Sequence, residues 1–247
     1  MTTTNMTADH EFMEPRAKTD NDTHQSSGLS NQIRLLAVLL VTSLALTVAL
    51  LFWFAHSQDK VAAANARHLA QTAVTVQTNN LQKILTDYTW WDEAYQKLVT
   101  NFDTAWFDEN FAEGDYLGDT FGITTSFLAG PDKKMLRHMR DSEIVTDGPN
   151  IDTATYFSGG VDALIQQAKR KVDDEYKAAV GLVRLNGEFY FAAVRVVHPH
   201  SEELLAKADV KADNAFVAAF MRPLDNELLQ TIGRDFGLQA LRRVAAD

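Results

Sequence analysis

The chain has 247 residues and a formal charge of −10, from 33 acidic against 23 basic residues. This length allows one large domain or two small ones, and the acidic balance lacks the positive surface that nucleic-acid binding requires. Cysteine is absent, which excludes thiolate metal sites, disulfides and cysteine nucleophiles.

The N-terminal region predicts a tail and a membrane span. Residues 1–34 are polar and rich in Thr, Asn, Asp and Ser without an apolar period, and this composition predicts a disordered tail. Residues 35–55, LLAVLLVTSLALTVALLFWFA, carry no charge, and a helix needs about 20 such residues to cross a bilayer. The long apolar run, the polar segment before it and the missing cleavage pattern disfavour a cleaved signal peptide. We therefore predict one transmembrane helix over residues 35–55.

The orientation of this helix does not follow from charge. Arg34 directly precedes the apolar run, but Lys60 and Arg67 follow it closely, and orientation depends on basic residues near the helix ends. A short tail and a large remainder favour a cytoplasmic tail and a periplasmic domain over residues 56–247. We therefore expect a single-pass protein of the bacterial inner membrane.

Residues 59–99 predict one continuous helix, because no Gly or Pro interrupts them and apolar residues recur at spacings of three and four. The stripe consists of Leu81, Ile84, Tyr88, Trp91, Tyr95 and Leu98. A thinner stripe of Ala62, Ala66, Leu69 and Ala73 precedes it. The two join near Gln77 by consecutive steps of four, which locally unwinds a coiled coil. The thin stripe permits close pairing, so we expect a homodimer through the 56–98 helix.

The remaining sequence predicts an antiparallel sheet with separate helices. Strands are expected at 121–129 and 135–140 around a turn at 130–134, at 179–185 and 188–197, and at 215–223; helices are expected at 161–172 and after Asp225. Asn186-Gly187 predicts a type I′ hairpin turn, because both residues tolerate positive φ. Asp225 is a typical helix cap. The fold class is therefore α+β.

The stretch DYTWWDEAYQKL, residues 87–98, is the strongest candidate for a site. Trp91 lies on the apolar stripe and is expected to pack in the core, whereas Trp90 points about 100° away and is expected at a groove or subunit contact. Asp92 is either a solvated or indole-bonded carboxylate, or the fixed polar group at the mouth of a ligand pocket with aromatic walls. The candidate ligand-binding residues are Asp87, Trp90, Trp91, Asp92 and Tyr95.

Other chemistry has weaker support. His198 and His200 stand two apart at the end of a predicted strand, and such a pair rarely forms a metal site, so no metal or cofactor is predicted. The sequence contains no P-loop, no Rossmann glycine fingerprint, no G-x-S-x-G and no H-E-x-x-H. The chain as given is therefore not expected to be an enzyme.

Several segments together resemble the fourth type of CHASE domain over roughly residues 60–243. They are a single membrane helix, the pattern D-x-x-x-W-D-x-x-Y from Asp87 to Tyr95, the segment that begins at Gly122-Ile123, GLVRLNGEFYFAAVRVVHP and RPLDNELL. The resemblance implies an extracellular sensory domain of a bacterial signalling protein, with a PAS- or Cache-like fold. Such domains normally precede a second membrane helix and a diguanylate cyclase, a cyclic di-GMP phosphodiesterase or a histidine kinase. No residues for those activities occur before Asp247.

The leading hypothesis is therefore a membrane-anchored periplasmic sensor that binds an unknown small molecule or a periplasmic protein, as the N-terminal part of a cyclic di-GMP receptor or as a standalone sensor. Two alternatives remain. One is a membrane-anchored envelope hydrolase that uses Asp87, Asp92 and His198 or His200. The other is a structural adaptor that dimerises through its helix.

Overall fold

The computed structural model describes residues 22–146, 150–157, 159–172, 177–238 and 241. They fall into two compact units, Met1–Ala63 and Ala64–Asp247. The described part of the first unit is helical and belongs to α1 (Asp22–Thr89). Among the described residues, α1 is the one helix long and apolar enough to cross a membrane, which is compatible with the span predicted over residues 35–55.

The predicted disordered tail differs from the structure in its second part. Residues 22–34 are helical and continue into the apolar run. Helix formation is cooperative, so a helix extends readily into neighbouring residues once it has formed. Residues 1–21 of the predicted tail lie outside the described residues.

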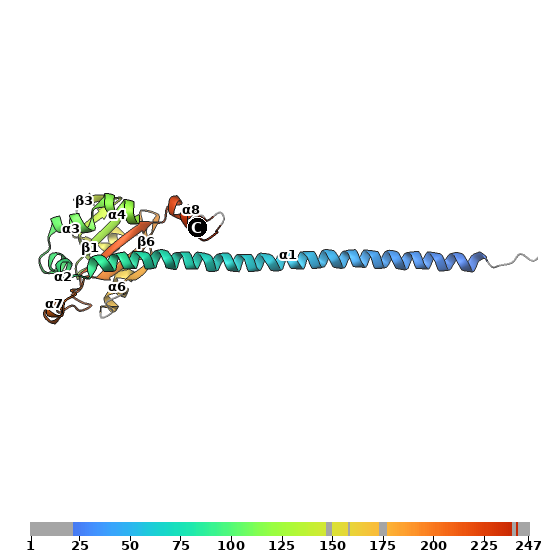
Figure 1. Ribbon diagram of the computed structural model, residues 1–247, viewed down its shortest axis with the longest axis horizontal. Helices are drawn as coiled ribbons and strands as arrows, with labels where there is room; N and C mark the ends of the chain where they lie inside the picture. Colours follow the sequence, from blue (N-terminus) through green and yellow to red (C-terminus); the bar gives the residue numbers. More distant parts are fainter. Residues whose placement is uncertain (1–21, 147–149, 158, 173–176, 239–240, 242–247) are drawn as a thin grey trace, which may run out of the picture. The chain divides into compact units, whose positions relative to one another are not determined.

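The second unit is built on a seven-stranded antiparallel sheet with the order β3-β2-β1-β7-β6-β5, in which β4 also pairs with β2 (Figure 1). The strands are β1 (Thr125–Ala129), β2 (Lys134–Arg140), β3 (Glu143–Val145), β4 (Ile151–Asp152), β5 (Ala179–Leu185), β6 (Glu188–Val196) and β7 (Val217–Pro223).

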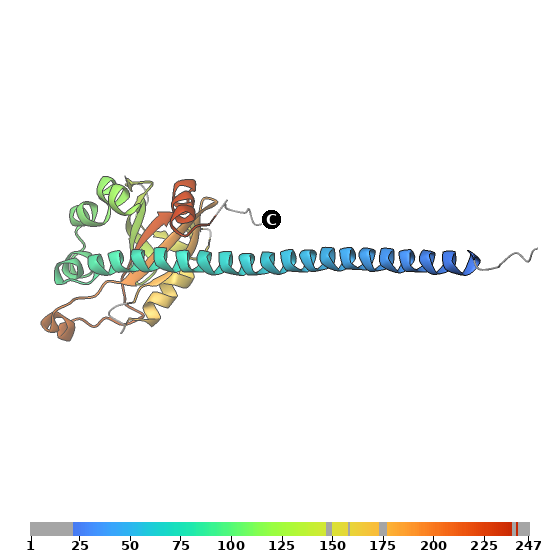
Figure 2. The ribbon, with the colours of Figure 1, turned by 45° about the vertical axis from the view of Figure 1, so that its right-hand side comes forward.

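Helices pack on both faces of this sheet (Figure 2). The helices after α1 are α2 (Asp92–Tyr95), the π-helix η1 (Gln96–Thr100), α3 (Thr104–Phe111), α4 (Gly114–Phe121), α5 (Thr153–Tyr156), α6 (Val161–Arg170), α7 (Glu202–Lys207) and α8 (Asn226–Asp235). One core joins α1, α3, α4 and α8 to the sheet, and a second core joins α6 and the end of α5 to the opposite face. The structure therefore confirms the α+β class with a long N-terminal helix and an antiparallel sheet.

Side-chain alternation along β7 decides which face receives its last residues. Successive strand residues point to opposite faces. Phe220 belongs to the core under α1, and Met221 belongs to the core under α6. Arg222 is next in the strand and therefore points to the α1 face, where its guanidinium contacts Gln77 of α1.

Local signals predicted several elements correctly. Asn186 and Gly187 both have positive φ, +51° and +87°, at the turn between β5 and β6. Asp225 caps α8, since its Oδ1 accepts a hydrogen bond from the N–H of Leu228. The strand expected at 121–129 is shorter than predicted, because α4 occupies residues up to Phe121 and β1 begins at Thr125. Neither α3 nor α4 was predicted from the sequence.

The prediction of one continuous helix to residue 99 is wrong. α1 ends at Thr89, and Trp91 has extended backbone angles, φ −151° and ψ 154°. Two groups from β6 and the residues after it hold the helix end. Arg195 Nη1 donates to the hydroxyl of Thr89 at 2.8 Å, and the N–H of His198 donates to the carbonyl of Thr89 at 3.1 Å. Because the last carbonyls of a helix lack partners within the helix, this contact favours an end at Thr89.

Candidate functional site

The break after Thr89 reverses the expected roles of the two tryptophans. Trp91 leaves the helical stripe and is 37% exposed, so the prediction that it packs in the core is wrong. Its indole Nε1 donates to the carbonyl of Tyr88 at 2.9 Å, and its ring lies 5.7 Å from that of Trp106. The indole therefore satisfies one of the carbonyls at the end of α1.

Trp90 occupies the more enclosed position of the pair. Its side chain is half-buried, and Arg195 lies 5.7 Å from its ring centroid. The imidazole of His200 meets the same indole edge-on at 5.2 Å. A guanidinium over an indole face is a favourable cation–π contact, so Trp90 joins the end of α1 to β6.

Asp92 links α2 to the segment after β6 through hydrogen bonds. Its Oδ1 accepts hydrogen bonds from the backbone N–H groups of His200 and Ser201, at 2.8 and 2.9 Å. The hydrogen bonds from Ser201, with a smaller one from His200, lower the pKa of the Asp92 carboxyl, since they favour its charged form. Asp92 is thus neither simply solvated nor bonded to an indole in the described contacts.

The five predicted ligand-binding residues point to different surroundings. Asp87 is exposed on the last turns of α1. Tyr95 lines a cavity of about 300 Å³ with η1 and the segment before β7, and burial raises the pKa of its hydroxyl. Trp90 and Asp92 share the contact with His200, whereas Trp91 faces Trp106. The structure does not gather the five into one described cavity, and their role in ligand binding stays a prediction.

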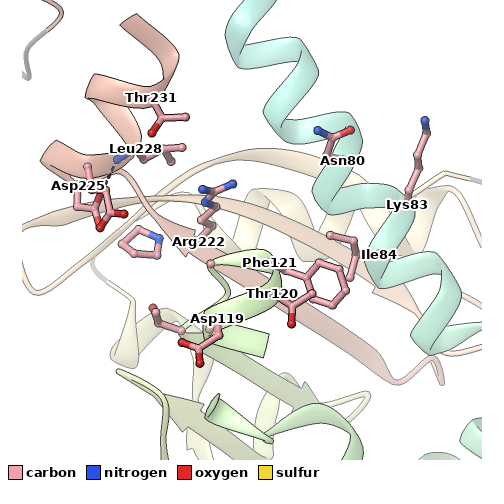
Figure 3. Close-up of a pocket in the computed structure, with 15 residues that line it drawn as sticks. Asn80, Lys83, Ile84, Asp119, Thr120, Phe121, Arg222, Asp225, Leu228 and Thr231 are labelled. Atoms are coloured by element: carbon pink, nitrogen blue, oxygen red, sulfur yellow. Dashed lines mark hydrogen bonds between the residues drawn. The ribbon is translucent and has the colours of Figure 1, made fainter. Parts of the chain in front are cut away.

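A larger polar pocket lies between α1, α4, the end of β7 and α8 (Figure 3). Its volume is about 640 Å³, within the range of small-molecule sites. The polar side chains on its wall are Asn80, Lys83, Asp119, Thr120, Thr124, Arg222, Asp225, Glu227 and Thr231. The wall is therefore mostly polar, with a few apolar contacts from Ile84, Phe121 and Leu228.

Arg222 is the central charged group of this pocket. Its side chain is half-buried, and its head lies between α1 and α8 in Figure 3. Nη1 donates to Oε1 of Gln77 at 3.2 Å. Burial lowers the pKa of Arg222, and the nearby carboxylates of Asp225 and Glu227 oppose this effect. An arginine stays protonated in proteins despite such shifts, so the pocket contains a fixed positive charge.

Gly122 provides the space that Arg222 occupies. It follows α4 with φ +68°, and its N–H donates to the carbonyl of Gly118 at 2.8 Å. A Cβ at this position would lie 2.7 Å from Nε of Arg222. The backbone turn therefore needs glycine both for its left-handed conformation and for the close approach of the guanidinium.

Arg222 was not among the residues predicted to bind a ligand, although it lies in the segment RPLDNELL. One signal was available, because alternation along the 215–223 strand places Arg222 on the same face as Phe220. The partner helix was not visible in the sequence, since 145 positions separate Gln77 from Arg222.

A buried histidine lies on the opposite face of the sheet. His138 of β2 is 3% exposed, and its ring packs edge-on against Tyr156 at 5.0 Å. Burial lowers the pKa of His138, and the positive charges of Arg137 and Arg140 lower it further. Its Nε2 has no hydrogen-bond partner among the described residues. The folded protein therefore favours the neutral imidazole.

The family model described as the CHASE4 domain matches residues 73–242 of the chain. This range covers more than half of the 247 residues and includes both the break after Thr89 and the pocket around Arg222. No curated protein matches the chain.

Proposed function

We propose that this chain, which belongs to the CHASE4 domain family, is the membrane-anchored periplasmic sensor of a bacterial signalling receptor. CHASE4 domains are sensory domains of such receptors, and the chain has a sensory role. We propose that residues 35–55 anchor it in the inner membrane, that the second unit lies in the periplasm with a PAS- or Cache-like fold, and that its output is cyclic di-GMP signalling. The function is sensing rather than catalysis.

The observation that carries the ligand-sensing part is the pocket between α1, β7 and α8. It combines a volume suited to a small molecule with a half-buried positive charge, several uncharged polar groups and three carboxylates. Pockets that bind small molecules use a few convergent polar groups to select and orient the ligand. We infer that this pocket receives the signal.

The pocket also supplies a route for the response. Asn80, Lys83 and Ile84 of α1 form one wall, and Leu228 and Thr231 of α8 form another. A ligand that binds one packing of these helices better than another shifts the population toward that packing. α1 also contains the predicted membrane span, so a change in its packing is the proposed output.

Homodimer formation through α1 remains part of the proposal. The predicted stripe cannot pair as a whole, because Ala73 is buried in the core of the second unit. Leu69 and Val76, seven residues apart and therefore on one face of α1, are exposed at 37% and 39%. Apolar side chains that stay in contact with water favour burial against a second copy. Sedimentation of the detergent-solubilised chain, with Val76→Glu as the disrupting variant, tests this; a monomer at all concentrations before substitution would contradict it.

Thermal unfolding of the full chain in detergent, in the presence of a small-molecule library, tests the sensing function. A ligand that binds the folded state raises the Tm. Thr231→Trp fills the pocket and should abolish this rise, whereas Gln230→Trp, an exposed neighbour on α8 that does not line the pocket, should preserve it. A rise that survives Thr231→Trp would exclude the pocket as the sensor site.

Topology needs a separate test. Reporter fusions after residue 60 should be active in the periplasm if the tail lies in the cytoplasm. A reporter that is active only in the cytoplasm would refute the periplasmic location of the second unit.

A further inference from the structure

We propose that the pocket between α1, β7 and α8 selects a small molecule that carries one oxyanion group, a carboxylate or a phosphate, through the guanidinium of Arg222. This inference rests on the proposed sensory function and adds the chemistry of the ligand. Three observations support it: Arg222 has N–H donors without a described partner, Gly122 and Gln77 hold its guanidinium in place, and the surrounding charges limit where an anion can bind.

The guanidinium has more donors than its described contacts use. An arginine carries five N–H donors in a planar fork that matches the two oxygens of a carboxylate or phosphate. Among the described residues, the hydrogen bond from Arg222 goes to the side chain of Gln77, at 3.2 Å. An oxyanion in the pocket would accept hydrogen bonds from two of the remaining donors, and these would be of the charge-assisted type, which is the stronger type.

The partial burial of Arg222 makes this contact more favourable than a surface ion pair. A charge removed from water loses hydration and interacts more strongly with an opposite charge nearby. The described ion pairs of the chain do not include Arg222. By comparison, Arg137 of β2 forms a bidentate pair with Asp108, at 2.7 and 2.8 Å. Among the residues that the structure describes, no carboxylate lies within ion-pair distance of Arg222, whereas Arg137 has one.

The seat of Arg222 is shaped to hold the guanidinium in one place. The turn at Gly122 leaves room for Nε because no Cβ is present, and Gln77 binds the Nη1 edge. A side chain held from two sides loses little additional entropy on binding a ligand. This preorganisation distinguishes Arg222 from Lys83, whose exposed ammonium points away from Arg222 in Figure 3.

The acidic side chains of the pocket limit where the anion binds. Asp225 lies on the α8 side of Arg222, and Asn80 lies on the α1 side (Figure 3). Asp225 is already engaged, because its Oδ1 caps the N–H of Leu228 at 2.8 Å. Its negative charge disfavours an anion near α8, so the oxyanion lies between Arg222 and Asn80, whose amide can donate to it.

The experiment uses the full chain in detergent, with acetate, benzoate and inorganic phosphate as oxyanion probes at matched ionic strength. Choline serves as a cationic probe and inositol as a neutral one. Each is titrated into the wild type and into Arg222→Gln, while the Tm is followed. Arg234→Gln is the matched control, because Arg234 is an exposed arginine of α8 outside the pocket.

At least one oxyanion should raise the Tm of the wild type and of Arg234→Gln. Arg222→Gln should weaken the apparent affinity roughly 10- to 150-fold, the range for a lost hydrogen bond to a charged group. Should Arg222→Gln fail to fold, Arg222→Lys serves instead: it keeps the charge but loses the fork, so the affinity should still fall, and an unchanged affinity would overturn the inference.

Two further outcomes would overturn it. One is an equal response to oxyanions in the wild type and Arg222→Gln, which places the anion elsewhere. The other is a response only to choline or inositol that Thr231→Trp removes. This second outcome would reject the oxyanion while leaving the proposed ligand-sensing function intact.

Discussion

Replacing Gly122 by alanine tests whether the turn after α4 holds Arg222 in the pocket. Gly122 has φ +68°, and an added Cβ would lie 2.7 Å from Nε of Arg222. Gly237, after α8, has φ +66°, and an added Cβ there would meet no atom within 4 Å. Gly237→Ala therefore introduces the backbone strain alone, whereas Gly122→Ala introduces the same strain and displaces the guanidinium.

The two effects have different expected sizes. An alanine in the left-handed region costs about 1–2 kcal/mol, so both variants should lose that much free energy of unfolding. Gly122→Ala should lose about 0.5–1.5 kcal/mol more, because the displaced guanidinium gives up its hydrogen bond to Gln77. For a domain of this size the extra loss lowers the Tm by about 1–6 °C.

Urea unfolding followed by tryptophan fluorescence measures the stability of both variants, and the oxyanion titration measures the pocket. Gly122→Ala should lose the response to oxyanions, and Gly237→Ala should keep it. If the two variants lose equal stability and both keep the response to oxyanions, then Gly122 does not position the guanidinium of Arg222.

Three further results are expected. Trp90→Ala should destabilise the chain by at least about 1 kcal/mol more than Trp91→Ala in urea unfolding, because Trp90 is the more buried indole; the opposite order would contradict the break after Thr89. Because the pKa of Asp92 is lowered in the folded state, its contribution to the free energy of unfolding is present above about pH 4 and is lost as the pH falls further. Asp92→Asn should therefore show a smaller fall in Tm between about pH 5 and 3 than the wild type. An unchanged slope would contradict the stabilising role of the contact with Ser201. The pKa of His138 is also lowered in the folded state, so the free energy of unfolding should decline as the pH falls through about 6.5. His138→Gln should show a smaller decline than the wild type between about pH 7.5 and 5. An equal decline in both proteins would mean that other groups cause it.

Elements with strong local signals were predictable from the sequence. The β5–β6 hairpin follows from Asn186-Gly187, because few other residue pairs adopt two positive φ angles easily. α8 begins after Asp225, because a carboxylate satisfies the free N–H groups of the first turn. The helical structure of residues 35–55 is consistent with their uncharged apolar run, and the place of this run in a membrane stays a prediction. In each case the cause lies within a few neighbouring residues, so it can be read without the fold.

The end of α1 and the composition of the pocket depended on the tertiary structure. The apolar spacing continues past Thr89, and nothing local stops the helix there. It ends where Arg195 and His198 supply hydrogen bonds from β6 and the segment after it. In the same way, Arg222 becomes a candidate ligand-binding group only when the antiparallel pairing of β7 brings it to Gln77. Contacts between distant segments carry no periodic or motif signal in one sequence, and so the fold alone decided which tryptophan is buried and which arginine faces the pocket.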